Sequence, residues 1–120
     1  MKEPLLQGLI AAPFTPMNED CTIKTEAIPA YADFIAAKGC LKGVFICGTS
    51  GESVSLTLEE RKNIAEAWTN AAKGRFKVIV HVGGMSQPDC VELAAHAASV
   101  GADMIAAMAP GFFKPASVKD

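Results

Sequence analysis

The sequence has few of the residues that bind metals or build disulfide frameworks. Its 120 residues include two histidines and four cysteines. No two of the cysteines, which are Cys21, Cys40, Cys47 and Cys90, have Cys-x-x-Cys spacing. Cysteines without such spacing are typical of small hydrophobic side chains in a reducing compartment. We therefore predict buried, unpaired cysteines, no metal site and a cytoplasmic location.

Neither sign of charge is in excess, and long apolar runs are missing. Lys and Arg number 11 against 13 Asp and Glu, which leaves a net charge of −2. Binding to nucleic acid or to an anionic membrane favours a basic excess. No apolar run approaches the ~20 residues of a membrane-spanning helix, and residues 1–4 lack the order of a secretion signal. The sequence predicts neither nucleic acid nor membrane as a partner.

Half of the residues are hydrophobic, and they form four apolar runs separated by amphipathic segments. The runs expected to form strands are 9–16, 43–47, 77–82 and 104–109, the first of them buried on both faces. Between the runs, apolar residues recur at helical spacing. The residues expected to cap three helices are Thr25, Thr57 with Glu60 as a capping box, and Ser86. The residues expected to end them are Gly39, Gly74 and Gly101.

Continuous apolar strands alternating with amphipathic helices predict a parallel sheet covered by helices. Right-handed crossovers then bring the turns that follow the strands to one edge, which carries the ligand site in such proteins. Two α/β architectures fit this pattern. One is a small open sheet, which the length of the chain favours. The other is the (β/α)8 barrel, which needs ~250 residues and eight strands.

One turn at this edge, Gly48-Thr49-Ser50-Gly51-Glu52, has the composition of an anion-binding turn. The two glycines allow a sharp bend, and Thr49 and Ser50 offer hydroxyl and backbone N–H groups. No lysine follows as in a nucleotide-binding phosphate loop, and Glu52 would repel a phosphate. A carboxylate is therefore the expected ligand. The alternative interpretation is an ordinary strand-to-helix turn with small residues for steric reasons.

Several segments in order resemble one family. They are Pro13-Phe14-Thr15-Pro16, the 48–52 turn with Leu56-Thr57-Leu58-Glu59-Glu60-Arg61, Ile79-Val80-His81-Val82-Gly83, and Ala109-Pro110-Gly111-Phe112-Phe113-Lys114-Pro115. Together they resemble the pyruvate-dependent class I aldolases, the family of dihydrodipicolinate synthase and N-acetylneuraminate lyase. His81-Val82-Gly83 is similar to the lyase branch, although Gly111 departs from the bulkier residue expected there.

The resemblance implies that residues 1–120 are the N-terminal half of one TIM-barrel domain, with its first four βα units, and that the chain is incomplete. It implies a homotetramer without a cofactor that cleaves N-acetylneuraminate, a sialic acid, into pyruvate and N-acetylmannosamine through a lysine Schiff base. Thr49 and Ser50 would bind the substrate carboxylate. We expect no catalytic residue here, and the lysine and the catalytic tyrosine to follow Asp120.

The remaining polar and aromatic candidates are expected to be structural. No lysine has the apolar strand setting that lowers an amine pKa. Glu52 is expected to stabilise its turn as an acceptor, His81 to be a satisfied core histidine, and Phe112 to make an aromatic contact between subunits. Two alternatives stay open: dihydrodipicolinate synthase or another pyruvate-dependent aldolase, and a non-catalytic flavodoxin-like binding domain.

Overall fold

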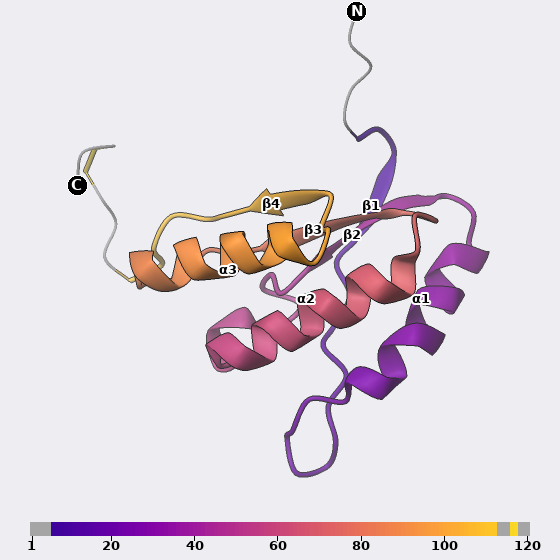
Figure 1. The fold of residues 1–120 in the computed structure, drawn as a ribbon, viewed down its shortest axis with the longest axis horizontal. Coiled ribbons are helices and arrows are strands. Elements are labelled where there is room, and N and C mark those ends of the chain that lie inside the picture. The colour runs from indigo at the N-terminus through magenta and orange to yellow at the C-terminus, as the bar shows by residue number, and fades with distance from the viewer. Residues whose placement is uncertain (1–5, 113–115, 118–120) are drawn as a thin grey trace, which may run out of the picture.

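The computed structural model describes residues 6–112 and 116–117, so Phe113, Lys114 and Pro115 of the motif above lie outside the described residues. Four strands form one sheet in the order β1-β2-β3-β4, and each neighbouring pair is parallel (Figure 1). The elements in chain order are β1 (Leu9–Ala11), η1 (Thr25–Ala27), α1 (Ile28–Ala37), β2 (Leu41–Ile46), η2 (Ser53–Ser55), α2 (Leu58–Ala72), β3 (Lys77–His81), α3 (Gln87–Ser99) and β4 (Met104–Ala106). The predicted alternation of parallel strands and helices is confirmed.

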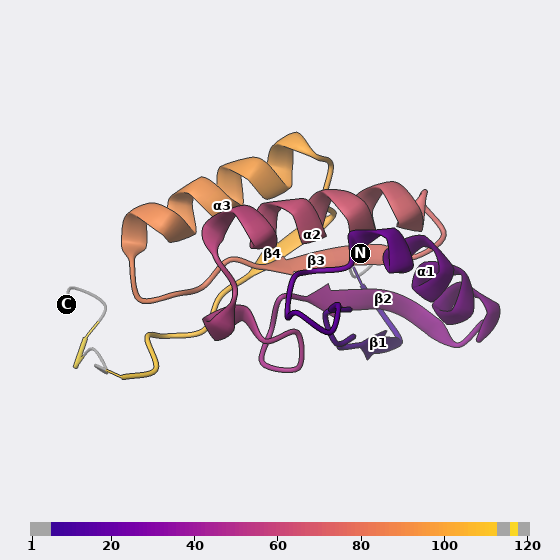
Figure 2. The ribbon, with the colours of Figure 1, turned by 90° about the horizontal axis from the view of Figure 1, so that it is seen from below.

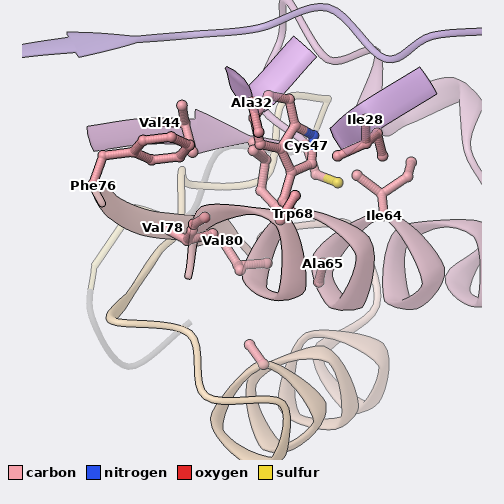
Figure 3. Close-up of a cluster of buried hydrophobic side chains, with 14 of the residues drawn as sticks. Ile28, Ala32, Val44, Cys47, Ile64, Ala65, Trp68, Phe76, Val78 and Val80 are labelled. Carbon is pink, nitrogen blue, oxygen red and sulfur yellow. The ribbon is translucent and has the colours of Figure 1, made fainter. Parts of the chain in front are cut away.

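All three α-helices cover the same face of the sheet (Figure 2). Alternate residues of the central strands point into the layer between sheet and helices, because side chains alternate across a strand. Val44 and Val80 are fully buried there against Trp68 of α2, which is 1% exposed (Figure 3). The apolar stripe of α2 thus packs on β2 and β3, and this packing is the centre of the fold.

The residues that cap or end the helices are those predicted from the sequence, with one exception. The side chain of Thr57 accepts a hydrogen bond from Glu60 N (3.2 Å), and the Glu60 carboxylate accepts one from Thr57 N (2.8 Å), which completes the capping box. Gly39, Gly74 and Gly101 follow the helices with positive φ. The prediction that Thr25 caps a helix was wrong. Thr25 is the first residue of the short 3-10 helix η1, and the N-cap of α1 is Ala27, which makes no side-chain hydrogen bond.

The expectation that the first strand is buried on both faces was also wrong. β1 has three residues, and Leu9 and Ile10 are 63% and 43% exposed. On β4, at the other edge, Ile105 is 53% exposed. The reason is that the helices cover one face only, and that each edge strand has a single neighbour. The apolar side chains of β1 and β4 therefore need contacts for their burial that these four strands and three helices do not provide.

The cysteines are unpaired as expected, but only Cys47 is fully buried. Cys21 and Cys40 are exposed because they lie in the polar connections on either side of α1, and Cys90 is half-buried on α3. Within the described residues, no cluster of three or more His, Cys, Asp or Glu could hold a metal ion. Among the helices of this same part of the chain, none is long and apolar enough to cross a membrane.

We expect the 120-residue chain to self-associate when it is produced alone. The open edges of β1 and β4 offer unpaired backbone groups, and Ile10 and Phe45 lie on the sheet face without helices. Leaving several hundred Å² of apolar surface in water costs on the order of 10 kcal/mol, comparable with the ~5–15 kcal/mol stability of a domain. Sedimentation at micromolar concentration should show species larger than a monomer. A cooperatively folded monomer would contradict this expectation.

Candidate functional site

The turn at residues 48–51 leaves the carboxyl end of β2 through an unusual backbone. Cys47 before it and Glu52 after it both have left-handed conformations, with φ of 53° and 60°. A Cβ atom on Gly51 would lie 2.9 Å from Cys47 N, and one on Gly48 would lie 2.6 Å from the Phe45 ring. Glycine is therefore sterically required at position 51, and a side chain at position 48 would displace the Phe45 ring. Left-handed non-glycine residues cost about 1–3 kcal/mol each, so other contacts must hold this conformation.

Those contacts are hydrogen bonds to four backbone carbonyl groups in and beside the turn. Two are local: Gly48 O accepts from Ser53 N (3.2 Å), and Thr49 O accepts from Glu52 N (3.0 Å). Two come from distant segments. Gly51 O accepts from the Thr15 hydroxyl at 2.7 Å in a buried bond, and Cys47 O contacts His81 Nδ1 at 3.0 Å. The turn is thus bonded at one end to the segment after β1 and at the other to the end of β3.

The N–H groups of the same turn are unused. Within the described part of the chain, no hydrogen bond is donated by the backbone N–H of residues 48–51, or made by the hydroxyls of Thr49 and Ser50. Gly48 and Gly51 are buried residues, and an unsatisfied N–H in such a place costs free energy. Consecutive N–H donors with occupied carbonyls favour an anionic ligand.

Glu52 does not act as we predicted. Its backbone stabilises the turn, because Glu52 N donates to Thr49 O and Glu52 O accepts from Ser55 N (2.9 Å). Its carboxylate is exposed and accepts no hydrogen bond from any described residue. A left-handed residue at the end of the turn directs this side chain to solvent, so the carboxylate is not the stabilising acceptor.

His81 ends β3 and is 4% exposed. The Cys47 carbonyl can only accept, so His81 Nδ1 carries the proton of their 3.0 Å hydrogen bond. His81 Nε2 is buried and has no partner among the described residues. Burial, together with the Arg61 cation, lowers the pKa of His81, against a smaller opposing effect of the bond to Cys47. The expectation of a satisfied core histidine is therefore met by only one of its two nitrogens.

Arg61 is the residue that the sequence analysis missed. It is 7% exposed, and its Nη2 donates to the carbonyl oxygens of His81 (2.7 Å) and Gly83 (3.0 Å). Burial raises the pKa of the Cys47 thiol to about 11, and the neighbouring Arg61 opposes that rise. The signal was in the helical spacing. Arg61 stands three residues before Ile64 and seven before Trp68, which places it on the buried stripe of α2.

A cavity of about 440 Å³ opens where the segments after β2, β3 and β4 meet. Thr49, Arg61 and His81 line it, together with residues from the start of α3 and residues 108–111. The prediction that these turns gather at one edge is confirmed. Ser50 and Phe112 are not among the lining residues, although Ser50 adjoins Thr49 in the turn.

The lysines and the tyrosine of the described residues have structural settings. Lys77, at the amino end of β3, is exposed and pairs with Asp103 at 2.7 Å. Lys62 pairs with Glu59 and Glu92 on the helical surface. Tyr31 lies between the rings of Phe14 and Trp68, tilted against Phe14 and edge-on to Trp68, with centroid distances of 4.9 and 5.3 Å. The arrangement can bind an anion, and no described lysine is desolvated enough to act as an amine nucleophile.

Several known proteins are similar to this chain in sequence and in fold. Residues 5–119 match the Dihydrodipicolinate synthetase family. N-acetylneuraminate lyase A of Xenopus laevis is 48% identical over 114 residues, which are 94% of this chain and 37% of that protein. The structure of Proteus mirabilis N-acetylneuraminate lyase superposes with a TM-score of 0.90 at 38% identity, over 95% of this chain and 38% of that one.

A third similar protein was solved with a ligand. It is a prophage protein of the dihydrodipicolinic acid synthase family from E. coli K12, in complex with pyruvate, with a TM-score of 0.87 and 30% identity over 94% of this chain and 38% of that one. The chain therefore spans little more than a third of the length of the relatives that it matches. Its four strands and three α-helices correspond to the N-terminal part of their TIM barrel.

We expect His81 to make stability depend on pH. Its folded-state pKa lies below the unfolded value of ~6.5. The unfolded chain therefore binds more protons below that pH, and the free energy of unfolding should fall as pH drops from about 6.5 to the folded-state pKa. Urea unfolding of the natural full-length protein between pH 5 and 7.5 measures this. His81→Asn should flatten the dependence, whereas the control His96→Asn, at a half-buried site on α3, should keep most of it. An unchanged slope in His81→Asn would refute the assignment.

Proposed function

Because the chain belongs to the dihydrodipicolinate synthetase family, we propose that it is part of a pyruvate-dependent aldolase with N-acetylneuraminate lyase activity. In this proposal, residues 1–120 form the N-terminal part of one barrel domain. The observation that carries it is the row of unpartnered N–H groups and hydroxyls at residues 48–51. Such a row suits the carboxylate that pyruvate and N-acetylneuraminate have in common.

The proposed role of the described residues is to anchor that carboxylate. Thr49 and Ser50 donate hydrogen bonds to its oxygens, and charge-assisted bonds of this kind contribute about 1.5–3 kcal/mol each. The anchor fixes the adjacent keto carbon for attack. Binding of this kind positions the reacting atoms before any bond changes.

The covalent chemistry belongs to a lysine and a tyrosine outside the described strands. The lysine amine attacks the keto carbon, and loss of water gives a protonated imine. The tyrosine takes the proton of the sugar hydroxyl next to the breaking C–C bond, and that C–O group becomes the carbonyl group of the released N-acetylmannosamine. The electron pair of the C–C bond passes to the imine. The resulting enamine takes up a proton, and hydrolysis then releases pyruvate and restores the free amine. The described residues contribute binding and orientation to this sequence of steps.

The identity of the aldehyde distinguishes this proposal from its sister activities. Dihydrodipicolinate synthase and other keto-acid aldolases share the same Schiff-base chemistry with pyruvate. His81-Val82-Gly83 and the 48% identity to the Xenopus laevis lyase favour the sialic-acid substrate. Release of N-acetylmannosamine with pyruvate by the natural full-length protein would support it, and release of another aldehyde would move the assignment within the family.

We expect the loss of either hydroxyl in the turn to weaken carboxylate binding. Thr49→Val and Ser50→Ala in the natural full-length protein should each raise the KM for N-acetylneuraminate about tenfold or more, because each removes a charge-assisted donor. Steady-state measurement of pyruvate release tests this. Ser55→Ala, an exposed serine on η2 beyond the turn, is the matched control. An unchanged KM in both turn variants would contradict the anchor.

We expect the 120-residue chain alone to have no lyase activity. Its described lysines lie on exposed or ion-paired surface positions, and none has the apolar surroundings of a Schiff-base lysine. Incubation with pyruvate and borohydride, followed by mass spectrometry, should show no reduced adduct. The natural full-length protein treated identically is the positive control. A stable adduct on any lysine between Lys2 and Lys119 would show that this expectation is wrong.

A further inference from the structure

The carboxylate anchor depends on a backbone conformation that its own residues do not favour. Cys47 and Glu52 are held in left-handed conformations, at φ of 53° and 60°. The two carbonyl groups that enclose the turn, those of Cys47 and Gly51, are occupied by residues 34 and 36 positions away. Contacts from outside the turn must therefore keep it in the form that leaves its N–H groups without partners among the described residues.

On the Cys47 side, His81 provides that support. Its Nδ1–H group holds Cys47 O at 3.0 Å, and the ring lies 5.9 Å from the Phe45 ring. A Cβ atom on Gly83 would lie 2.9 Å from His81 Nε2 and 3.0 Å from Met108 N. Only glycine therefore leaves the space in which the imidazole sits.

Arg61 fixes the strand end that carries the imidazole. One guanidinium nitrogen, Nη2, donates to the carbonyls of both His81 and Gly83. Arg61 stands in the first turn of α2, which the Thr57–Glu60 capping box begins. The helix start, the end of β3 and the end of β2 are thus joined in series by hydrogen bonds, and all three residues of this series, Arg61, His81 and Cys47, are buried.

We propose that His81 is a positioning residue for the lyase reaction: its Nδ1–H group, held in place by Arg61, keeps the Cys47 carbonyl turned away from the substrate so that the N–H groups of residues 48–51 face the carboxylate. This inference rests on the proposed function. The support from His81 strengthens carboxylate binding equally in the ground state and in the transition state, because the carboxylate does not change during C–C cleavage. Loss of the support should therefore act on KM and leave kcat nearly unchanged.

The test compares His81→Leu with His81→Asn in the natural full-length protein. Leucine removes the donor, whereas the amide nitrogen of asparagine occupies nearly the place of Nδ1. We expect His81→Leu to raise the KM for N-acetylneuraminate about fivefold to tenfold, the effect of one lost buried hydrogen bond, with kcat within about twofold of wild type. His81→Asn should recover most of the affinity. His96→Asn is the matched control and should behave as wild type.

The split between the two constants separates positioning from general damage to the fold. Partial unfolding lowers the number of active molecules, which reduces kcat and leaves KM unchanged. That pattern in His81→Leu, or equal KM values in the leucine variant and the wild type, would overturn the proposal. So would an asparagine variant that is no better than leucine.

A second measurement judges the proposal if His81→Leu fails to fold. Nitrogen-15 spectra of the wild-type imidazole at pH 7.5 report which ring nitrogen carries the proton. We expect the Nδ1–H form, and the Nε2–H form would overturn the proposal. If the wild-type protein releases no pyruvate from N-acetylneuraminate, the proposed function is refuted. The imidazole spectrum still shows in that case whether His81 Nδ1 donates a hydrogen bond to the Cys47 carbonyl.

Discussion

The hydrogen bond between His81 Nδ1 and the Cys47 carbonyl joins two neighbouring strands at the point where each leaves the sheet. It forms because β2 and β3 pair in parallel, with Ile46 opposite Val80, so that the residues that follow lie side by side. The pairing is buried beneath α2, where Trp68 covers both strands. Site geometry in this protein is therefore a consequence of core packing. A shift of register by one residue would remove the imidazole from the turn.

A second constraint is that all the helices cover one face of the sheet. The opposite face and both sheet edges need further strands, and the family barrel supplies them in relatives of which this chain matches 37–38%. The anchor turn requires none of those strands to form its hydrogen bonds. Its partners are Thr15, Ser53, Glu52 and His81, all within the described residues. In the proposed function, one part of the barrel binds the carboxylate and another part provides the nucleophile.

This division follows from what each group requires. A carboxylate anchor needs N–H and hydroxyl donors at a strand end, which a short glycine-bracketed turn provides. A Schiff-base lysine needs a desolvated amine inside the barrel, and an open sheet leaves its inner face in contact with water. The described lysines accordingly pair with carboxylates at the surface. The buried cation, Arg61, is used for backbone support and not for covalent chemistry.

The sequence by itself determined the features whose causes are local. Apolar runs and helical spacing identified the strands and helices. The Thr57–Glu60 box and the glycines at helix ends marked boundaries, because the groups that form them are a few residues apart. The composition of the 48–52 turn predicted an anion site, and this stays a prediction. The tertiary structure alone decided which carbonyls of that turn are occupied, since Thr15 and His81 reach it from 36 and 34 residues away. It also decided that Thr25 does not cap α1, that β1 is exposed, and that Arg61 is buried, because each depends on what packs against the residue in space.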